Sequence, residues 1–164
     1  MVLWIEQRTS GSTRNAKYQG PHPVTFNDAG LKLIKEFEGC SLVAYQDQGA
    51  LWTIGYGCTH NVSSGMTITA DQAEERLKSD LESTVSVTTS LLKNSLTDNQ
   101  FSAVICFAYN VGCGNFAKST LLHCINTLHL EDAANEFEKW DKIAGIENAG
   151  LLRRRKAERD LFLA

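Results

Sequence analysis

Residues 37–57 read FEGCSLVAYQDQGALWTIGYG, and this stretch decides the fold that we expect for the chain. It begins at the end of a predicted helix, passes through a polar turn and returns as a strand. Residues 42–46 and 51–57 have the composition of strands, and the residues between them favour a turn, so the pattern predicts a β-hairpin. Three side chains with possible chemistry lie in the stretch: Glu38, Asp47 and Thr53.

The helix before the hairpin separates two neighbouring acids. Asn27 is the expected N-cap, and Gly39 is typical of a residue that ends a helix. At about 100° per residue, Glu38 falls within the apolar arc of the helix and Glu36 falls opposite. The apolar side chains on that arc are Leu31, Leu33, Ile34 and Phe37. We therefore expect Glu38 to face the body of the protein and Glu36 to face water.

The returning strand is predicted to have two unlike faces. Three large side chains alternate along one face, which should pack against the protein: Trp52, Ile54 and Tyr56. The opposite face carries Thr53, Gly55 and Gly57. Because glycines leave the backbone bare, this second face is expected to be open to a ligand.

The remaining chain is predicted to be helical. Thr69 and Thr97 each begin a capping-box pattern. The first predicts a long helix to about residue 93, and the second a buried helix that ends near residue 112. Shorter helices are expected over 119–127, 131–140 and 149–162. We predict an α+β, predominantly helical fold, in which a long helix joins a small β-hairpin lobe to a larger helical lobe.

The chain has 164 residues, which suits one domain, and its 43% hydrophobic and 21% charged residues are typical of a globular protein. The sequence has no run of about twenty apolar residues, so no membrane span is predicted. The apolar start, residues 1–5, is too short for a signal peptide, so we expect the protein in the cytoplasm. Residues 1–24 show no lasting periodicity and predict a poorly ordered extension, which leaves 25–164 as the domain.

The formal net charge of −3 argues against nucleic acid as a general partner. Basic residues are nevertheless concentrated near the end of the chain, as Arg153, Arg154, Arg155, Lys156 and Arg159. They could form a local patch for an anionic polymer. A solvated helix face is the simpler interpretation for most of them.

The cysteines do not have the spacing of a metal site. The chain has five, with no C-x-x-C motif, and Cys58 with His60 is only a weak zinc candidate. No metal is therefore expected. Reduced, mostly buried thiols are the favoured interpretation. If a disulfide forms, Cys40 with Cys58 is the first candidate because both border the hairpin.

Two carboxyl groups in unlike surroundings suit glycoside hydrolysis. An apolar setting favours the protonated form of a carboxyl group, which suits Glu38 as a proton donor. Asp47, in a polar turn, suits the carboxylate that stays ionised, and the Thr53 hydroxyl could hold a water. Taken one at a time, these residues are better explained by structural roles, because two acids nine positions apart are common. Periodicity alone does not name a substrate.

The motifs together are more specific. Glu38-Gly39, Tyr45-Gln46-Asp47 and the WTIGYG of residues 52–57 resemble the signature of the phage-type lysozymes, glycoside hydrolase family 24. The spacing from Glu38 to Asp47 to Thr53 matches as well. The resemblance continues through residues 96–101, 109–116, 119–122 and 152–158, so that it covers about 25–163. It is closer to the lambdoid-prophage branch than to other members.

The resemblance implies an endolysin: a muramidase that cleaves the β-1,4 bond between N-acetylmuramic acid and N-acetylglucosamine in peptidoglycan and lyses the host cell. It implies a monomer without metal or organic cofactor. Glu38 would be the general acid, Asp47 the second carboxylate and Thr53 the residue that positions water. Asn110 and Arg154 would belong to the substrate site, with Arg154 the arginine favoured to face Glu38.

Two departures qualify the resemblance. Relatives usually place histidine directly after Gly-Tyr-Gly, where this chain has Cys58, so a polar link between the lobes is in question. The first 23 residues are too polar for a signal-arrest-release segment. We therefore expect no stable membrane insertion, and accumulation in the host cytoplasm until a holin opens the membrane.

Two other functions remain open at the level of sequence. A lytic transglycosylase needs one acid, and Asp47 with Thr53 counts against it. A cell-wall-binding module without activity is disfavoured by the intact catalytic trio.

Overall fold

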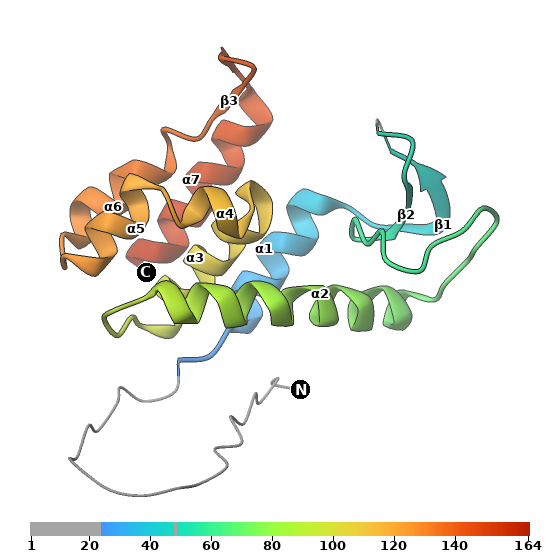
Figure 1. Cartoon of the computed structure of the whole chain (residues 1–164), viewed down its shortest axis with the longest axis horizontal. Coiled ribbons are helices and arrows are strands. Elements are labelled where there is room, and N and C mark those ends of the chain that lie inside the picture. Colours follow the sequence, from blue (N-terminus) through green and yellow to red (C-terminus); the bar gives the residue numbers. More distant parts are fainter. Residues whose placement is uncertain (1–23, 48) are drawn as a thin grey trace, which may run out of the picture.

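The computed structural model of the chain describes residues 24–47 and 49–164. The long helix α2 (Ala70–Leu91) joins a small β-hairpin lobe to a larger lobe made of helices (Figure 1). The α+β, mostly helical prediction is therefore confirmed. The predicted N-terminal extension lies outside the described residues up to residue 23. None of the helices described is long and apolar enough to span a membrane.

Helix α1 (Asp28–Glu38) has the predicted caps. The Asn27 side chain accepts a hydrogen bond from the Gly30 amide at 3.1 Å, and Gly39 follows the helix with φ +65°. That left-handed conformation favours glycine and turns the chain out of the helix. Glu38 is thus the last helical residue before the β-hairpin lobe.

The hairpin pairs β1 (Ser41–Gln46) with β2 (Trp52–Gly55) in antiparallel register, and Tyr45 lies opposite Thr53. Residues 66–68 lie along the other edge of β1, where the Ala44 amide donates to the Met66 carbonyl at 2.8 Å. This pairing gives β1 a neighbour on both edges.

Strand β2 ends two residues earlier than predicted. Gly55 and Gly57 have φ values of +65° and +93°, so the chain reverses within the Gly-Tyr-Gly motif. Cys58 returns opposite Ile54, and their amides and carbonyls bond reciprocally at 2.9 and 3.0 Å. The motif is therefore a tight turn rather than the end of a strand.

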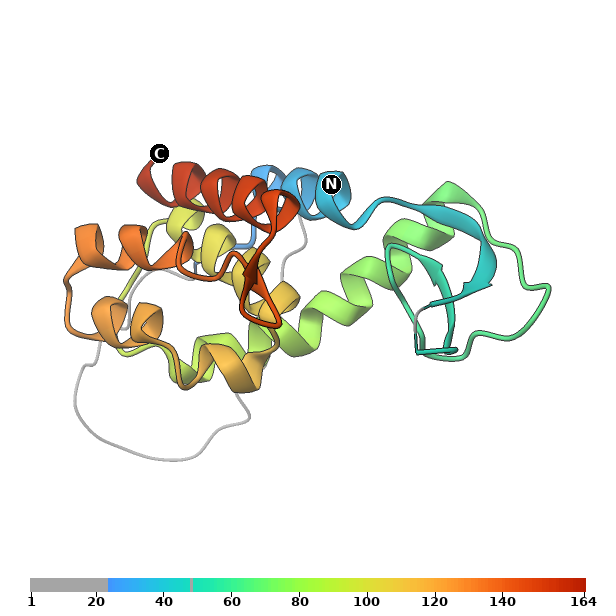
Figure 2. The same ribbon diagram turned by 90° about the horizontal axis from the view of Figure 1, so that it is seen from above.

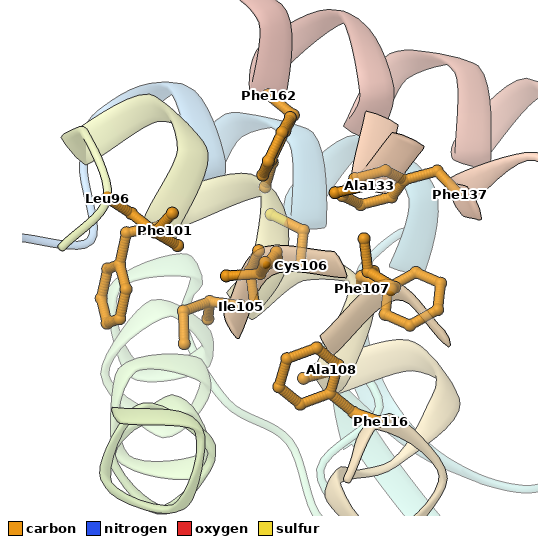
Figure 3. Packing of buried hydrophobic residues seen from close by; sticks show 14 of the residues in the cluster. Leu96, Phe101, Ile105, Cys106, Phe107, Ala108, Phe116, Ala133, Phe137 and Phe162 are labelled. Atoms are coloured by element: carbon orange, nitrogen blue, oxygen red, sulfur yellow. The ribbon is translucent and has the colours of Figure 1, made fainter. Parts of the chain in front are cut away.

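Both predicted capping boxes are present, at Thr69 for α2 and at Thr97 for α3 (Asp98–Val111). Helix α3 lies in the middle of the helical lobe, and every residue from 101 to 108 is buried. The rings of Phe107, Phe116, Phe137 and Phe162 gather around it in the core (Figure 3). Phe107 makes edge contacts with Phe137 and Trp140, each at 5.4 Å between ring centroids.

The expected shorter helices are α5 (Thr120–Asn126), α6 (Leu130–Phe137) and α7 (Ala149–Leu163). Two elements were not predicted: α4 (Cys113–Phe116) and the hairpin of β3 (Lys142–Ile143) with β4 (Ile146–Glu147). Each is too short for a periodicity. Helix α7 lies alongside α1 and α3 (Figure 2), which brings its inward side chains to the end of α1.

Candidate active site

Glu38 occupies the boundary between the two lobes. It is the last residue of α1, and about 23% of its side chain is exposed. Glu36, two positions earlier, is exposed. The helix-phase prediction that distinguished the two acids is confirmed. Glu38 is thus within reach of solvent and also directed toward groups of the protein interior.

The interior group is Arg154 of α7. Its Nη1 donates to Glu38 Oε1 at 2.7 Å, and its Nε donates to Glu158 Oε1 at 3.1 Å. Only 5% of the Arg154 side chain is exposed. Arg154 is therefore the arginine that faces Glu38, as expected. Because Arg154 is buried, it is better placed to hold Glu38 than to contact a polymer.

A second arginine continues the network. Arg155 is fully buried, and its Nη2 donates to Glu158 Oε1 at 2.9 Å and to Asn110 Oδ1 at 2.8 Å. Its guanidinium lies 4.9 Å from the centroid of the Phe107 ring, within the range of a cation–π contact. Asn110, exposed near the end of α3, is in this way linked to the groups behind Glu38.

The predicted basic patch must be corrected accordingly. Arg154 and Arg155 are buried in ion pairs, and Arg159 pairs with Glu138 at 3.2 Å. Arg153 and Lys156 are exposed. The run of adjacent cations conceals these pairs, and within the helix only the spacing of Arg154 and Glu158 indicates one of them.

Burial changes the proton affinity of groups around Glu38. Desolvation raises the pKa of Glu158 to about 7, against the lowering effect of Arg155 and Arg154, and the charge of Glu38 raises it further. Burial is also the main cause that raises the pKa of Tyr109, followed by the charge of Glu38. Tyr109 is therefore a neutral phenol near the acid throughout the physiological range.

Asp47 is held by the hairpin turn. Its Oδ1 accepts hydrogen bonds from the Gly49 amide at 2.8 Å and the Leu51 amide at 2.9 Å. The Asp47 amide also donates to the Leu51 carbonyl, and the Ala50 amide to the Asp47 carbonyl, each at 3.0 Å. The two bonds to Oδ1 fix the direction of the carboxylate, and the two backbone bonds close the turn.

Thr53 lies on a face that is not open as predicted. Its exposed fraction is 3%, and its Oγ1 donates to the Leu51 carbonyl at 3.2 Å. Gly55 on the same face has Ala73 of α2 and Ile68 about 3.5 Å from where a Cβ would lie. The strand is buried on both faces because α2 packs against it, which local alternation cannot reveal.

Gly57 is the glycine of this motif that borders the acid. A Cβ at Gly57 would lie 4.0 Å from Glu38 Oε2, and the residue is exposed. Beside it, Cys58 is buried. Arg76 of α2 donates from Nη1 to the Cys58 sulfur at 3.7 Å and to the His60 carbonyl at 3.0 Å. A polar link from the turn to α2 therefore exists with cysteine at this position.

All five cysteines are free thiols, so the candidate pairing of Cys40 with Cys58 is not formed. Three of them are buried, in agreement with the favoured interpretation. In the part of the chain that the structure describes, no three potential ligands are grouped as a metal site would require.

The structure thus brings Glu38, Arg154 and Asn110 into one hydrogen-bonded chain, and places Asp47 and Thr53 on the adjoining hairpin. Sequence reasoning assigned no role to Glu158, Arg155 or Tyr109. A signal for Glu158 was available: it follows Arg154 by four positions, and charges at that spacing share one helix face.

Comparison with known proteins decides the family. The phage lysozyme family model matches residues 35–158. The chain belongs to the phage lysozyme family. It is 40% identical to an endolysin of Acyrthosiphon pisum secondary endosymbiont phage 1 over 140 residues, which cover 83% of this chain and 96% of the relative. An endolysin of Salmonella phage P22 is 40% identical over 82% of this chain and 95% of its own length.

A solved structure agrees with these relatives. The muramidase domain of SpmX from Asticaccaulis excentricus superimposes with a TM-score of 0.81 at 35% identity, over 85% of this chain and 98% of that domain. This phage lysozyme is therefore an endolysin-type glycoside hydrolase with the lysozyme fold. The likeness to the P22 endolysin is consistent with the lambdoid branch.

Proposed function

We propose that this lysozyme hydrolyses the β-1,4 bond between N-acetylmuramic acid and N-acetylglucosamine, with Glu38 as the proton donor. The observation that carries this proposal is the unequal setting of the two Glu38 oxygens. Oε1 is held by Arg154, and Oε2 borders the exposed backbone of Gly57. A proton on Oε2 would be directed to the side from which a polysaccharide can approach.

In this mechanism Glu38 protonates the glycosidic oxygen as its bond to the anomeric carbon breaks. A water then adds its oxygen to that carbon, and one of its protons passes to a carboxylate of the site, Glu38 or Asp47. Asp47 is the second carboxylate, whose negative charge stabilises the positive charge that develops on the sugar ring. The rigid turn supports this role for Asp47. Two backbone amides donate to Oδ1, so the carboxylate is already oriented before the substrate binds.

Thr53 is assigned to positioning the water. Its hydroxyl hydrogen is already engaged by the Leu51 carbonyl, so the oxygen is left to accept a hydrogen bond. A water that donates to Thr53 Oγ1 would have its own lone pair free for attack. Pairing with Tyr45, two positions before Asp47, keeps this hydroxyl on the same hairpin as the carboxylate.

Asn110 is the candidate for substrate contact on the helical lobe, because it is exposed and its Oδ1 is fixed by Arg155. The remaining amide hydrogens could donate to a sugar or peptide carbonyl. For Arg154 we propose a positioning role, since its donors are directed to Glu38 and Glu158.

Product analysis on purified peptidoglycan tests the reaction. Mass spectrometry of the released muropeptides should show reducing N-acetylmuramic acid ends, with one water added per bond cleaved. Products that end in 1,6-anhydro-N-acetylmuramic acid would instead identify a lytic transglycosylase. Intact peptidoglycan after prolonged incubation, with substrate still bound, would identify a binding module.

We propose further that the enzyme acts as a monomer and that its route to the wall depends on a holin. The kinship with phage endolysins supports this route. Expression of the full chain in a Gram-negative host should leave the culture intact until a holin is co-expressed. Lysis without a holin would overturn the proposed route, and a dimer in sedimentation analysis would overturn the monomer.

A further inference from the structure

Arg154 is shared between two carboxyl groups. Its Nη1 is bonded to Glu38, at the end of α1, and its Nε to Glu158, one turn further along α7. The two acids therefore compete for, and jointly orient, a single guanidinium. Since its Nη2 lies 3.5 Å from the Cys106 carbonyl, at the limit of a hydrogen bond, Glu158 is the main group that holds Arg154 from behind.

Glu158 is built into the interior. It has no exposed surface, and its Oε1 accepts from both Arg154 and Arg155. Its Oε2 is buried and receives no hydrogen bond from the residues that the structure describes. Arg155 in turn bonds Asn110, so that Glu158 is the central member of a chain that runs from Glu38 to the end of α3.

The titratable groups that face Glu158 come from three helices. Arg154 and Arg155 face it from α7, Glu38 from α1, and the Cys106 thiol from α3. With both acids ionised, two cations balance two anions in a site that excludes most water. Removal of the Glu158 charge would leave both guanidinium charges acting on Glu38, and would weaken the attraction that holds Arg154 in place.

We propose that Glu158 is a positioning residue of this lysozyme, which holds Arg154 against Glu38 and sets how strongly Arg154 attracts the Glu38 carboxylate. The proposal rests on the assignment of Glu38 as the proton donor. Glu158 itself is buried behind Arg154, so it does not touch substrate. The pKa of Glu158 is raised to about 7, so the charge of Glu158 changes near neutral pH, and the attraction between Arg154 and Glu38 changes with it.

Glu158→Gln tests the proposal, because glutamine keeps the acceptor oxygen and removes the charge. We expect kcat on solubilised peptidoglycan to fall at least about tenfold and KM to stay unchanged. The reason is that a correctly positioned proton donor contributes several powers of ten to the rate. The alkaline limb of the activity profile should also move down by roughly one pH unit, because the variant lacks a negative charge behind the proton donor. The matched control is Glu138→Gln, which removes a partly exposed carboxylate at the end of α6 that pairs with Arg159 of α7. It should leave kcat and the pH profile as in the parent.

A second measurement keeps the test independent of activity and of the folding of Glu158→Gln. NMR can follow the titration of the carboxyl carbons in protein with isotopically labelled glutamates. In Glu38→Gln the negative charge of Glu38 no longer acts on Glu158, so Glu158 should titrate at lower pH than in the parent. An unchanged Glu158 titration, or a Glu158→Gln enzyme with parental kcat and pH profile, would overturn the proposal. Failure of the proton-donor assignment is distinguishable, because Glu38→Gln would then remain active whatever the NMR shows.

Discussion

Arg154 Nη1 lies 2.7 Å from Glu38 Oε1, although 116 positions separate the two residues in the chain. The bond ties the last turn of α1 to α7, so the acid that precedes the small lobe is held by the large one. The pair is asymmetric, since 23% of Glu38 but only 5% of Arg154 is exposed. The Arg154 guanidinium is thus a fixed part of the interior, and the Glu38 carboxylate is the partner that solvent and substrate can reach.

The first prediction concerns Glu38→Gln. Loss of the transferable proton should lower lytic activity by roughly 10²–10⁴. The free energy of unfolding should stay within about 1 kcal/mol of the parent, because the amide oxygen still accepts from Arg154. Turbidity clearing and urea unfolding measure the two effects. Glu36→Gln, two positions away on the exposed face, is the control and should match the parent in both assays.

The second prediction concerns Arg154→Ala. Glu38 and Glu158 would lose the cation between them, and breaking a buried pair by removing one partner costs about 3–5 kcal/mol. Chemical denaturation at pH 7 measures this loss. Arg159→Ala breaks an ion pair between α7 and Glu138 at the end of α6, whose two side chains are about a third exposed, at 35% and 34%. It should cost no more than about 1 kcal/mol. Equal losses in the two variants would contradict the difference in burial.

The sequence predicted those features of the site that depend on one element. The phase of α1 separated Glu38 from Glu36, and cap chemistry at Asn27, Thr69 and Thr97 located three helix starts. Each rests on contacts within a few residues, which local pattern records. The roles of Asp47 and Thr53 came from family resemblance, and they stay predictions.

What the sequence could not predict depends on contacts between elements. Thr53 and Gly55 alternate as residues of an open face would, yet Ala73 of α2 packs against that face. Arg154 and Arg155 look like part of a cationic surface, yet both lie against Glu158 in the interior. In each case the deciding partner is supplied by helix packing, because a short motif does not specify what covers it.

The third prediction is a pH dependence at Glu74. Hydrogen bonds, first from Lys35 and then from Lys78, lower the pKa of Glu74 from its ordinary value of 4.5 to about 2. Because the folded state has the lower value, the stabilisation is fully present above about pH 4.5 and is lost as the pH falls toward 2. The difference in melting temperature between parent and Glu74→Gln should therefore shrink across that window.

Salt and a neighbouring variant provide the controls for Glu74. The pair is partly exposed, so added salt should reduce the difference from the parent at neutral pH. Glu75→Gln changes the next residue of α2, which is exposed and has no ion pair among the residues described. It should show little pH-dependent difference, and an equal response in both variants would point to overall charge instead of the bonds to Lys35 and Lys78.

The fourth prediction concerns the crossing of α1 and α3 at Gly30. An alanine Cβ there would lie 2.7 Å from the Phe26 ring and 2.8 Å from Ser102 Cβ. Ser102 cannot easily yield, because its Oγ accepts from the Asn27 amide at 2.9 Å. Overpacking of this kind costs about 1–3 kcal/mol, which exceeds the gain of up to about 1 kcal/mol from a better helix former. Gly30→Ala should therefore lower stability in urea unfolding and disturb the helix that carries Glu38.

Gly114→Ala, with no atom within 4 Å of its Cβ, is the control and should be neutral or stabilising. A Gly30→Ala enzyme as stable as the parent would show that α1 can move away from α3 without cost.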